Sequence, residues 1–127
     1  PTVAACHSLI ASEIPELFPK LRFSFVEAGA QWVPYVVADL RRRRLGKTLP
    51  DNPLKQYGMY VCCETSDDLP WILKYAGEDN LCIGTDYGHT DTSSEIEAMR
   101  NLKQKGDISP EVIDKILYDN PRALHNL

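Results

Sequence analysis

The sequence predicts a parallel α/β fold in which strands alternate with helices. Three short runs, 22–27, 59–64 and 81–86, have the aromatic, β-branched and sulfur-containing composition of strands. The segments around them carry apolar residues at helical spacing. Because helical crossovers join parallel strands through right-handed connections, we expect a parallel sheet covered by helices.

The first half of the chain contains two predicted helices. One spans 3–18, with its apolar residues on or near one side and a kink or restart at Pro15. The other spans 31–44 and closes in four arginines at 41–44, where cations suit the partial negative charge of a helix C-terminus. A polar connection is expected over 45–58. The apolar residues of these two helices are Val3, Ile10, Ile14, Leu17 and Phe18, then Trp32, Val33, Val36, Val37 and Leu40.

The second half contains further helices with recognisable ends. A helix from Asp67 or Asp68 to Ala76 stops at Gly77, and Thr92 with Glu95 forms a candidate capping box for the next helix. That helix carries Ile96, Met99 and Leu102, and Gly106 ends it. Ser109-Pro110-Glu111 starts another helix, and Asn120-Pro121 starts a last short one.

Three strands are few for a fold of this class. A closed (β/α)8 barrel has eight strands in about 250 residues. We therefore expect residues 1–127 to be a single segment, the C-terminal part of a larger (β/α)8 TIM barrel. The start at Pro1 rather than Met fits this expectation. A small independent three-layer domain is the alternative.

Composition narrows the choice of partners. The net charge of −4 provides no basic field for nucleic acid or anionic lipid, and no apolar run approaches the ~20 residues of a membrane span. We expect neither nucleic acid nor membrane as a partner. The four cysteines include no C-x-x-C pair, and three of them sit in strand-like runs. Buried, reduced thiols are expected, which favours a cytoplasmic setting.

The chemistry is expected at the carboxyl ends of the strands, where the loops of a parallel α/β fold converge. Each predicted strand ends in a carboxylate: Glu27, Glu64 and Asp86. Asp86 is the strongest candidate, because it lies in a tight strand-to-loop passage with His89 three residues on. A carboxylate there can bind a metal ion and accept a proton from metal-bound water. His89 could be a ligand, a proton donor, a substrate contact or only a surface residue.

Other polar residues have simpler interpretations. Glu64 leads into Thr65-Ser66-Asp67-Asp68 and could equally belong to a helix N-terminus. Asp91 is expected to be a helix cap. His7, within a helix, and His125, near the chain end, are expected to be structural.

Three segments in order resemble the amidohydrolase superfamily. They are Phe18–Ala30 (FPKLRFSFVEAGA), Ile83–Tyr87 (IGTDY) and Asp119–Leu124 (DNPRAL). The closest resemblance is to its amidohydrolase-related branch, which includes aminocarboxymuconate-semialdehyde decarboxylase and similar metal-dependent enzymes. It implies that the three strands are the sixth to eighth of the barrel. The family's H-x-H pair on strand one and its strand-five histidine would then lie upstream of Pro1.

The resemblance also implies a cofactor and roles for individual residues. It implies zinc or a similar divalent ion, with Asp86 as a metal ligand and the proton acceptor of bound water. Glu27 stands where many members have a histidine, and Gly88 stands where a proline is common. Glu27 would be a ligand, a base or a substrate contact. His89, Trp32 and Tyr87 are weaker candidates for lining the pocket, and Glu64 rests on its strand-end position alone.

These observations together predict a metal-dependent amidohydrolase-like enzyme. It would hydrolyse or non-oxidatively decarboxylate a small organic acid or amide, and residues 1–127 alone would be inactive. We expect a small-molecule substrate and a homo-oligomer. The alternatives are a non-catalytic barrel relative, which the change at Glu27 favours, and a small independent α/β binding domain.

Overall fold

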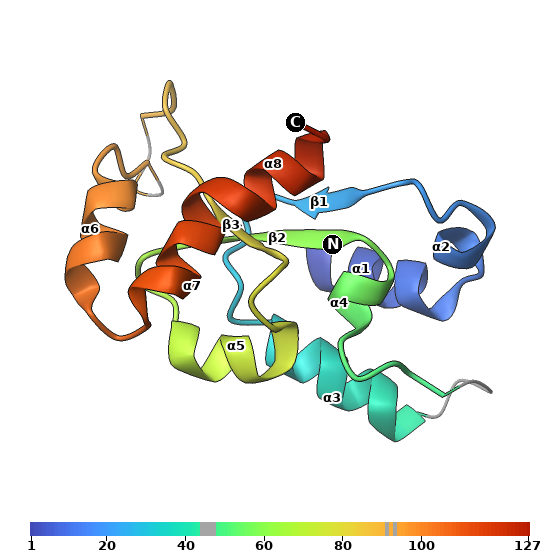
Figure 1. The fold of residues 1–127 in the computed structure, drawn as a ribbon. Coiled ribbons are helices and arrows are strands. Elements are labelled where there is room, and N and C mark those ends of the chain that lie inside the picture. Colours follow the sequence, from blue (N-terminus) through green and yellow to red (C-terminus); the bar gives the residue numbers. More distant parts are fainter. Residues whose placement is uncertain (44–47, 91, 93) are drawn as a thin grey trace.

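The computed structural model describes residues 1–43, 48–90, 92 and 94–127, which form a sheet with helices packed around it (Figure 1). The three strands are β1 (Phe23–Phe25), β2 (Met59–Cys63) and β3 (Leu81–Ile83). They lie in the order β1-β2-β3, and both pairs are parallel. The predicted parallel α/β architecture is therefore confirmed, with each strand shorter than expected at its carboxyl end.

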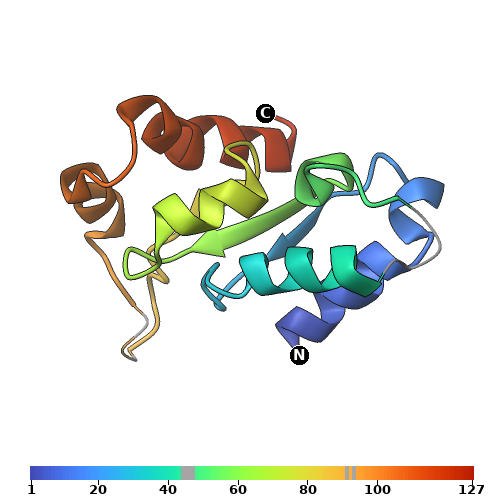
Figure 2. The same cartoon turned by 90° about the horizontal axis from the view of Figure 1, so that it is seen from below.

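Helices connect the strands and cover the sheet. Helices α1, α3 and α5 lie along one side of it, and turning the molecule shows α3 and α5 beside β2 (Figure 2). η1 and α8 pack against β3, and α7 packs against η1 and α6. The helices are α1 (Thr2–Ala11), α2 (Ile14–Leu17), α3 (Val33–Arg43), α4 (Pro53–Gln56), α5 (Leu69–Ala76), α6 (Ala98–Lys105), α7 (Pro110–Asp114), η1 (Lys115–Asp119) and α8 (Asn120–His125).

The core lies between the sheet and the helices. Alternate strand residues point toward it, because successive side chains of a strand face opposite sides. Phe25, Val61 and Ile83 belong to this core. The opposite face carries residues at the alternate positions, namely Ser24, Tyr60, Cys62 and Cys82. Ser24 is exposed and Cys62 is half-buried, so this second face is less completely covered.

Several helix ends have the expected residues. Asp68 caps α5 by accepting from the Trp71 N–H at 3.1 Å, and Ser109 caps α7 by accepting from the Val112 N–H at 3.4 Å. Gly77 follows α5 with a φ of 68°. The basic end of α3 is seen as far as Arg43. The expectations for Arg44 and Asp91 concern residues outside the described part of the chain.

The first predicted helix is two helices. Pro15 lies in the first turn of α2, where its missing N–H costs no intrahelical bond. The break turns α2 away from the core. Leu17 is 66% exposed and Phe18 is 55% exposed. The restart predicted at Pro15 is therefore confirmed, but the expectation that Leu17 and Phe18 share one side with the apolar residues of α1 is wrong.

The Thr92–Glu95 capping box is also wrong. Helix α6 begins at Ala98, its N-cap residue is Glu97, and no side chain caps it. Of the three apolar residues assigned to it, only Leu102 is buried. The capping motif failed because the Glu95 carboxylate is engaged elsewhere, in bonds described below.

Two further elements were not predicted. The connection 45–58 contains α4, which Asn52 caps by accepting from the Lys55 N–H at 3.0 Å. The last two helices are joined by the π-helical segment η1, so the chain stays helical from Pro110 to His125. Pro121 lies in the first turn of α8, directly after this π turn.

The four cysteines are free: Cys6, Cys63 and Cys82 are buried, and Cys62 is half-buried. Among the residues that the structure describes, no helix is long and apolar enough to cross a membrane.

Candidate active site

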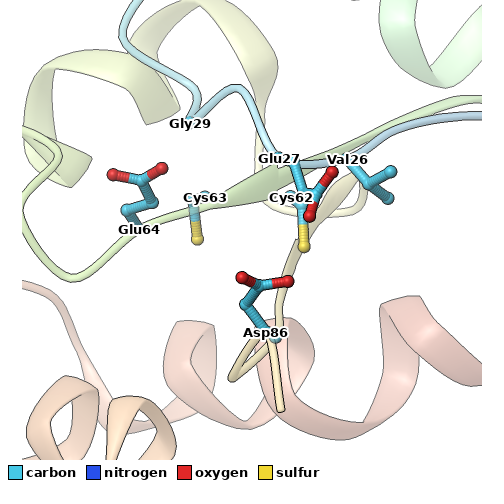
Figure 3. A pocket seen from close by; sticks show the side chains of 8 residues that line it. Val26, Glu27, Gly29, Cys62, Cys63, Glu64 and Asp86 are labelled. Atoms are coloured by element: carbon cyan, nitrogen blue, oxygen red, sulfur yellow. The ribbon is translucent and has the colours of Figure 1, made fainter. Parts of the chain in front are cut away.

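A cleft opens at the carboxyl ends of the three strands (Figure 3). Its volume is about 330 Å3, within the range of small-molecule pockets. Glu27, Glu64 and Asp86 all line it, each from the end of a different strand. The remaining lining residues are Val26, Gly29, Cys62, Cys63 and Gly84.

Two of these carboxylates meet at one histidine. His89 Nδ1 lies 2.8 Å from Asp86 Oδ1 and 3.2 Å from Glu27 Oε1. One ligand atom from each residue lies within 4.8 Å of the others. Figure 3 shows the Glu27 and Asp86 carboxylates on facing sides of the cleft. The fold therefore joins residues 62 positions apart in the sequence, 27 and 89, into one cluster.

Both carboxylates sit on unusual backbone. Glu27 has a φ of 55° and Asp86 a φ of 52°, in the left-handed region that residues with a side chain rarely adopt. The third non-glycine residue with positive φ among those described is Asn126, which ends α8. Strained backbone of this kind persists where the surrounding structure fixes it, and it concentrates at functional sites. At both strand ends it turns the chain sharply out of the sheet and into the cleft.

Hydrogen bonds hold the Asp86 backbone in place. The Ser94 hydroxyl donates to the Asp86 carbonyl at 3.0 Å, and the Glu95 N–H donates to the Thr85 carbonyl at 3.0 Å. The His89 N–H also donates to the Asp86 carbonyl, at 3.3 Å. The residues that follow β3 therefore fold back onto the end of their own strand.

The Glu95 carboxylate links this segment to its neighbours. It accepts from the Thr65 hydroxyl at 2.5 Å and from Asn101 Nδ2 at 2.6 Å. These two donors, Thr65 first, lower the pKa of Glu95, and partial burial opposes them. The carboxylate thus connects the loop after β2 to the segment after β3 and to α6.

Asp67 links the loops after β1 and β2. Its side chain is only 6% exposed, and Oδ2 accepts from the Ala30 N–H at 2.8 Å and the Glu64 N–H at 2.9 Å. Gly29 allows this approach, because a Cβ there would lie 3.3 Å from Asp67 Oδ1, and its φ of 56° suits glycine.

Other candidate residues lie around the cluster without joining it. Glu64 lines the cleft but accepts from the Ser66 hydroxyl at 3.3 Å and lies apart from the Glu27–Asp86 pair in Figure 3. Trp32 donates to the Gly29 carbonyl at 2.8 Å and packs edge-on against Phe25, so its observed contacts are those of a packing residue.

Tyr87 and the remaining histidines lie elsewhere. Tyr87 is 86% exposed and is not among the residues that line the cleft. His7 is half-buried in α1, with Nε2 3.5 Å from Asp39 Oδ2, and His125 ends α8. Both occupy the structural settings expected of them.

The cysteines beneath the cleft lack the properties of nucleophiles. Burial raises the pKa of Cys62 and, more strongly, that of Cys63. The reactive form of cysteine is the thiolate. The thiols thus remain protonated near pH 7 and form part of the cleft wall.

The Glu27–Asp86–His89 cluster fits a divalent cation in its donor chemistry. Two carboxylates and one imidazole supply hard oxygen and borderline nitrogen donors, which suit ions from manganese to zinc. The ligand atoms are close enough together to share one ion. The cleft also lacks a compensating positive side chain among its described lining residues, which include three acids.

Sequence reasoning missed the residues that support the cluster. Thr65 and Asp67 were interpreted as part of a helix N-terminus, Glu95 matched a capping motif, and no role was predicted for Ser94. Only the spatial proximity of three strand ends reveals their hydrogen bonds. Serine, threonine or aspartate after a strand can indicate a side chain that bonds to the backbone of a neighbouring loop. The same residue types also cap helices, so the sequence alone does not distinguish the two roles.

Comparison with known proteins relates the fold to a class of enzymes. No protein-family model matches the chain. The chain is similar to the crystal structure of an amidohydrolase from Mycobacterium avium subsp. paratuberculosis K-10, with 25% sequence identity and a TM-score of 0.73. The match covers 96% of this chain and 33% of that protein, so the chain spans about one third of its length. This similarity supports a relationship to the amidohydrolase superfamily and a hydrolase-type relative.

Proposed function

We propose that this chain supplies the strand-six to strand-eight part of a metal-dependent enzyme of the amidohydrolase-related branch. The observation that carries the proposal is the meeting of Glu27, Asp86 and His89 in a cleft at the carboxyl ends of parallel strands. Active sites of parallel barrels lie at this end of the strands. The similarity to a solved amidohydrolase supports the same class of chemistry.

Electrostatics support a cation in this cluster. Two carboxylates close together repel each other when both are ionised, unless a proton or a cation lies between them. In the structure, His89 Nδ1 lies within hydrogen-bonding distance of both. A divalent ion, zinc or one of similar preference, would be held by Asp86 with Glu27 and His89, and would activate water and polarise a substrate oxygen.

The side chains have separate tasks in this proposal. Asp86 is the proton acceptor, because its carboxylate lines the cleft and lies 2.8 Å from His89 Nδ1. His89 Nδ1 lies between the two acids in the structure and would be a ligand when an ion is bound. Glu27 provides a fixed negative charge where many relatives have a histidine.

The substrate class follows from the size and charge of the cleft. About 330 Å3 accommodates a small organic acid or amide. Three acids in the lining would repel a carboxylate substrate unless a cation offset them, so hydrolysis or decarboxylation of such an acid would depend on the metal. Glu64, at the far side of the cleft, would contact the substrate rather than the ion.

The proposal assigns only part of the active site to these residues. The chain spans about one third of the solved amidohydrolase, and it holds three histidines, none in H-x-H spacing. Further ligands would come from other strands of a barrel. A non-catalytic relative that retains cation binding without turnover is the second candidate, and the glutamate at position 27 favours it.

The proposal is tested by measuring cation affinity in designed variants. Zn2+ and Mn2+ are titrated calorimetrically into the wild-type chain, Glu27→Gln, Asp86→Asn and Glu64→Gln. We expect Glu27→Gln and Asp86→Asn each to lower affinity at least tenfold, because each removes an anionic ligand. Glu64→Gln, the matched control in the same cleft, should change it less than twofold. Equal affinity in all four proteins would contradict the proposal.

A longer protein containing this segment would separate the two candidate functions. Cation-dependent turnover that Asp86→Asn abolishes is expected of the enzyme. Cation binding without turnover of any small acid or amide would support the non-catalytic relative instead.

A further inference from the structure

The Asp86–His89 segment is fixed from outside the cluster by residues that have no contact with the cleft. Glu95 donates its backbone N–H to the Thr85 carbonyl at 3.0 Å, directly before Asp86. Its carboxylate accepts the Thr65 hydroxyl at 2.5 Å. Neither Thr65 nor Glu95 lines the cleft. Among the described residues, the pair therefore reaches the site through the backbone of Thr85.

The backbone around Thr65 is itself held by hydrogen bonds. Lys105 Nζ donates to the Thr65 carbonyl at 2.9 Å and to the Asp67 carbonyl at 2.8 Å, and it pairs with Asp107 at 3.0 Å. Asp67 is in turn bonded to the Ala30 N–H, in the loop that follows Glu27. A chain of hydrogen bonds thus runs from the β1 loop, through the β2 loop, to the end of β3.

We infer that the Glu95–Thr65 pair is a positioning latch, which holds Asp86 and His89 at the distance from Glu27 that the site requires. The inference rests on the proposed function for its consequence, but the latch itself can be observed without any cation. Asp86 needs such support because its φ of 52° is unfavourable for an aspartate. Neighbouring bonds must fix that conformation.

The latch depends on the hydrogen bond from the Thr65 hydroxyl to the Glu95 carboxylate. Hydrogen bonds to a charged group are stronger than neutral ones. The Glu95 pKa is lowered by Thr65 and Asn101, as expected of an ionised acceptor. Removal of the Thr65 hydroxyl leaves Asn101 bonded to Glu95, so α6 keeps its contact while the link to the β2 loop is lost.

The test compares Thr65→Val with Thr65→Ser in the full chain. Valine has nearly the shape of threonine without the hydroxyl, whereas serine keeps the hydroxyl. The first readout is amide hydrogen exchange by NMR at Glu95 and His89, with the Val61 amide as control because it donates to Asn80 within the sheet. In Thr65→Val we expect the amides of Glu95 and His89 to exchange about tenfold faster than in wild type. In Thr65→Ser their exchange rates should equal those of wild type, and the Val61 rate should not change in either variant.

The second readout is Mn2+ affinity of the same proteins. Thr65→Val should bind about tenfold more weakly than wild type, and Thr65→Ser should bind within twofold of it. If Thr65 were only structural, Thr65→Val would lower the free energy of unfolding, but Mn2+ affinity would not follow the presence of the hydroxyl in Thr65→Val and Thr65→Ser.

The possible outcomes separate the latch from the proposed function. Unchanged exchange at Glu95 and His89 in Thr65→Val would overturn the latch. Unchanged Mn2+ affinity in Thr65→Val, with affinity lost in Asp86→Asn, would overturn its positioning role and leave the proposed function intact. A wild-type chain that binds no Mn2+ would count against the proposed function, and hydrogen exchange alone would then decide the latch.

Discussion

Substitution of Asp67 tests whether the loops around the cleft are held by a buried carboxylate. In Asp67→Ala, the Ala30 N–H loses its acceptor, and Ala30 is fully buried. The Glu64 N–H also loses its partner but lies on an exposed residue, where water can replace the bond. A buried donor without a partner costs about 1–3 kcal/mol, and a charged hydrogen bond contributes about 1.5–3 kcal/mol. We expect Asp67→Ala to lower the free energy of unfolding by about 3 kcal/mol.

Urea denaturation followed by tryptophan fluorescence measures this effect. Asp67→Asn keeps an acceptor oxygen and should cost about 1 kcal/mol, since it loses only the charge. Asp68→Ala is the matched control: Asp68 is exposed and caps α5, so its removal should cost about 1 kcal/mol. An Asp67→Ala protein within about 0.5 kcal/mol of wild type would refute the reasoning. So would an Asn variant as unstable as the Ala variant.

Three further predictions follow from the same structure. The Glu95 pKa is lowered on folding, so its contribution to stability is present above the unfolded pKa and is lost as pH falls through the folded pKa. Glu95→Gln should therefore be less stable than wild type at pH 7, and urea titrations at successively lower pH should show this gap closing. A gap that does not change as the pH falls would contradict this. The chain should self-associate at micromolar concentration, because β1 is an edge strand and the apolar residues Leu17, Phe18 and Val26 are exposed. A compact monomer in light scattering would favour an independent domain. The purified 127-residue chain should have no amidohydrolase-type turnover, and chelator-sensitive turnover of a small acid or amide would show the opposite.

The order of elements was predictable because strand composition and helix caps are local signals. The runs at 59–64 and 81–86 form β2 and β3, and Ser109 and Asp68 cap the helices assigned to them. The errors arose where one residue type at a given position is compatible with two different hydrogen-bonding roles. Glu95 fits a capping box in sequence, but its carboxylate has stronger partners across the loop.

The candidate site was only partly accessible to sequence reasoning. A parallel sheet brings strand ends together, so Glu27 and Asp86 could be expected at one edge of it. That His89 would bridge them depends on the positive φ values of Glu27 and Asp86, which no residue type at these positions indicates. The supporting bonds of Asp67 and Thr65 join segments far apart in sequence and required the structure.

The most direct test of the central claim is to locate the cation. Crystals of the chain grown with Zn2+ or Mn2+ are measured at the absorption edge of each metal, and anomalous difference maps are calculated. We predict one strong peak bounded by Glu27 Oε1, an Asp86 carboxylate oxygen and His89 Nδ1, which disappears in Asp86→Asn. A map without a peak at this cluster at saturating metal, or with a peak that persists in Asp86→Asn, would contradict the account.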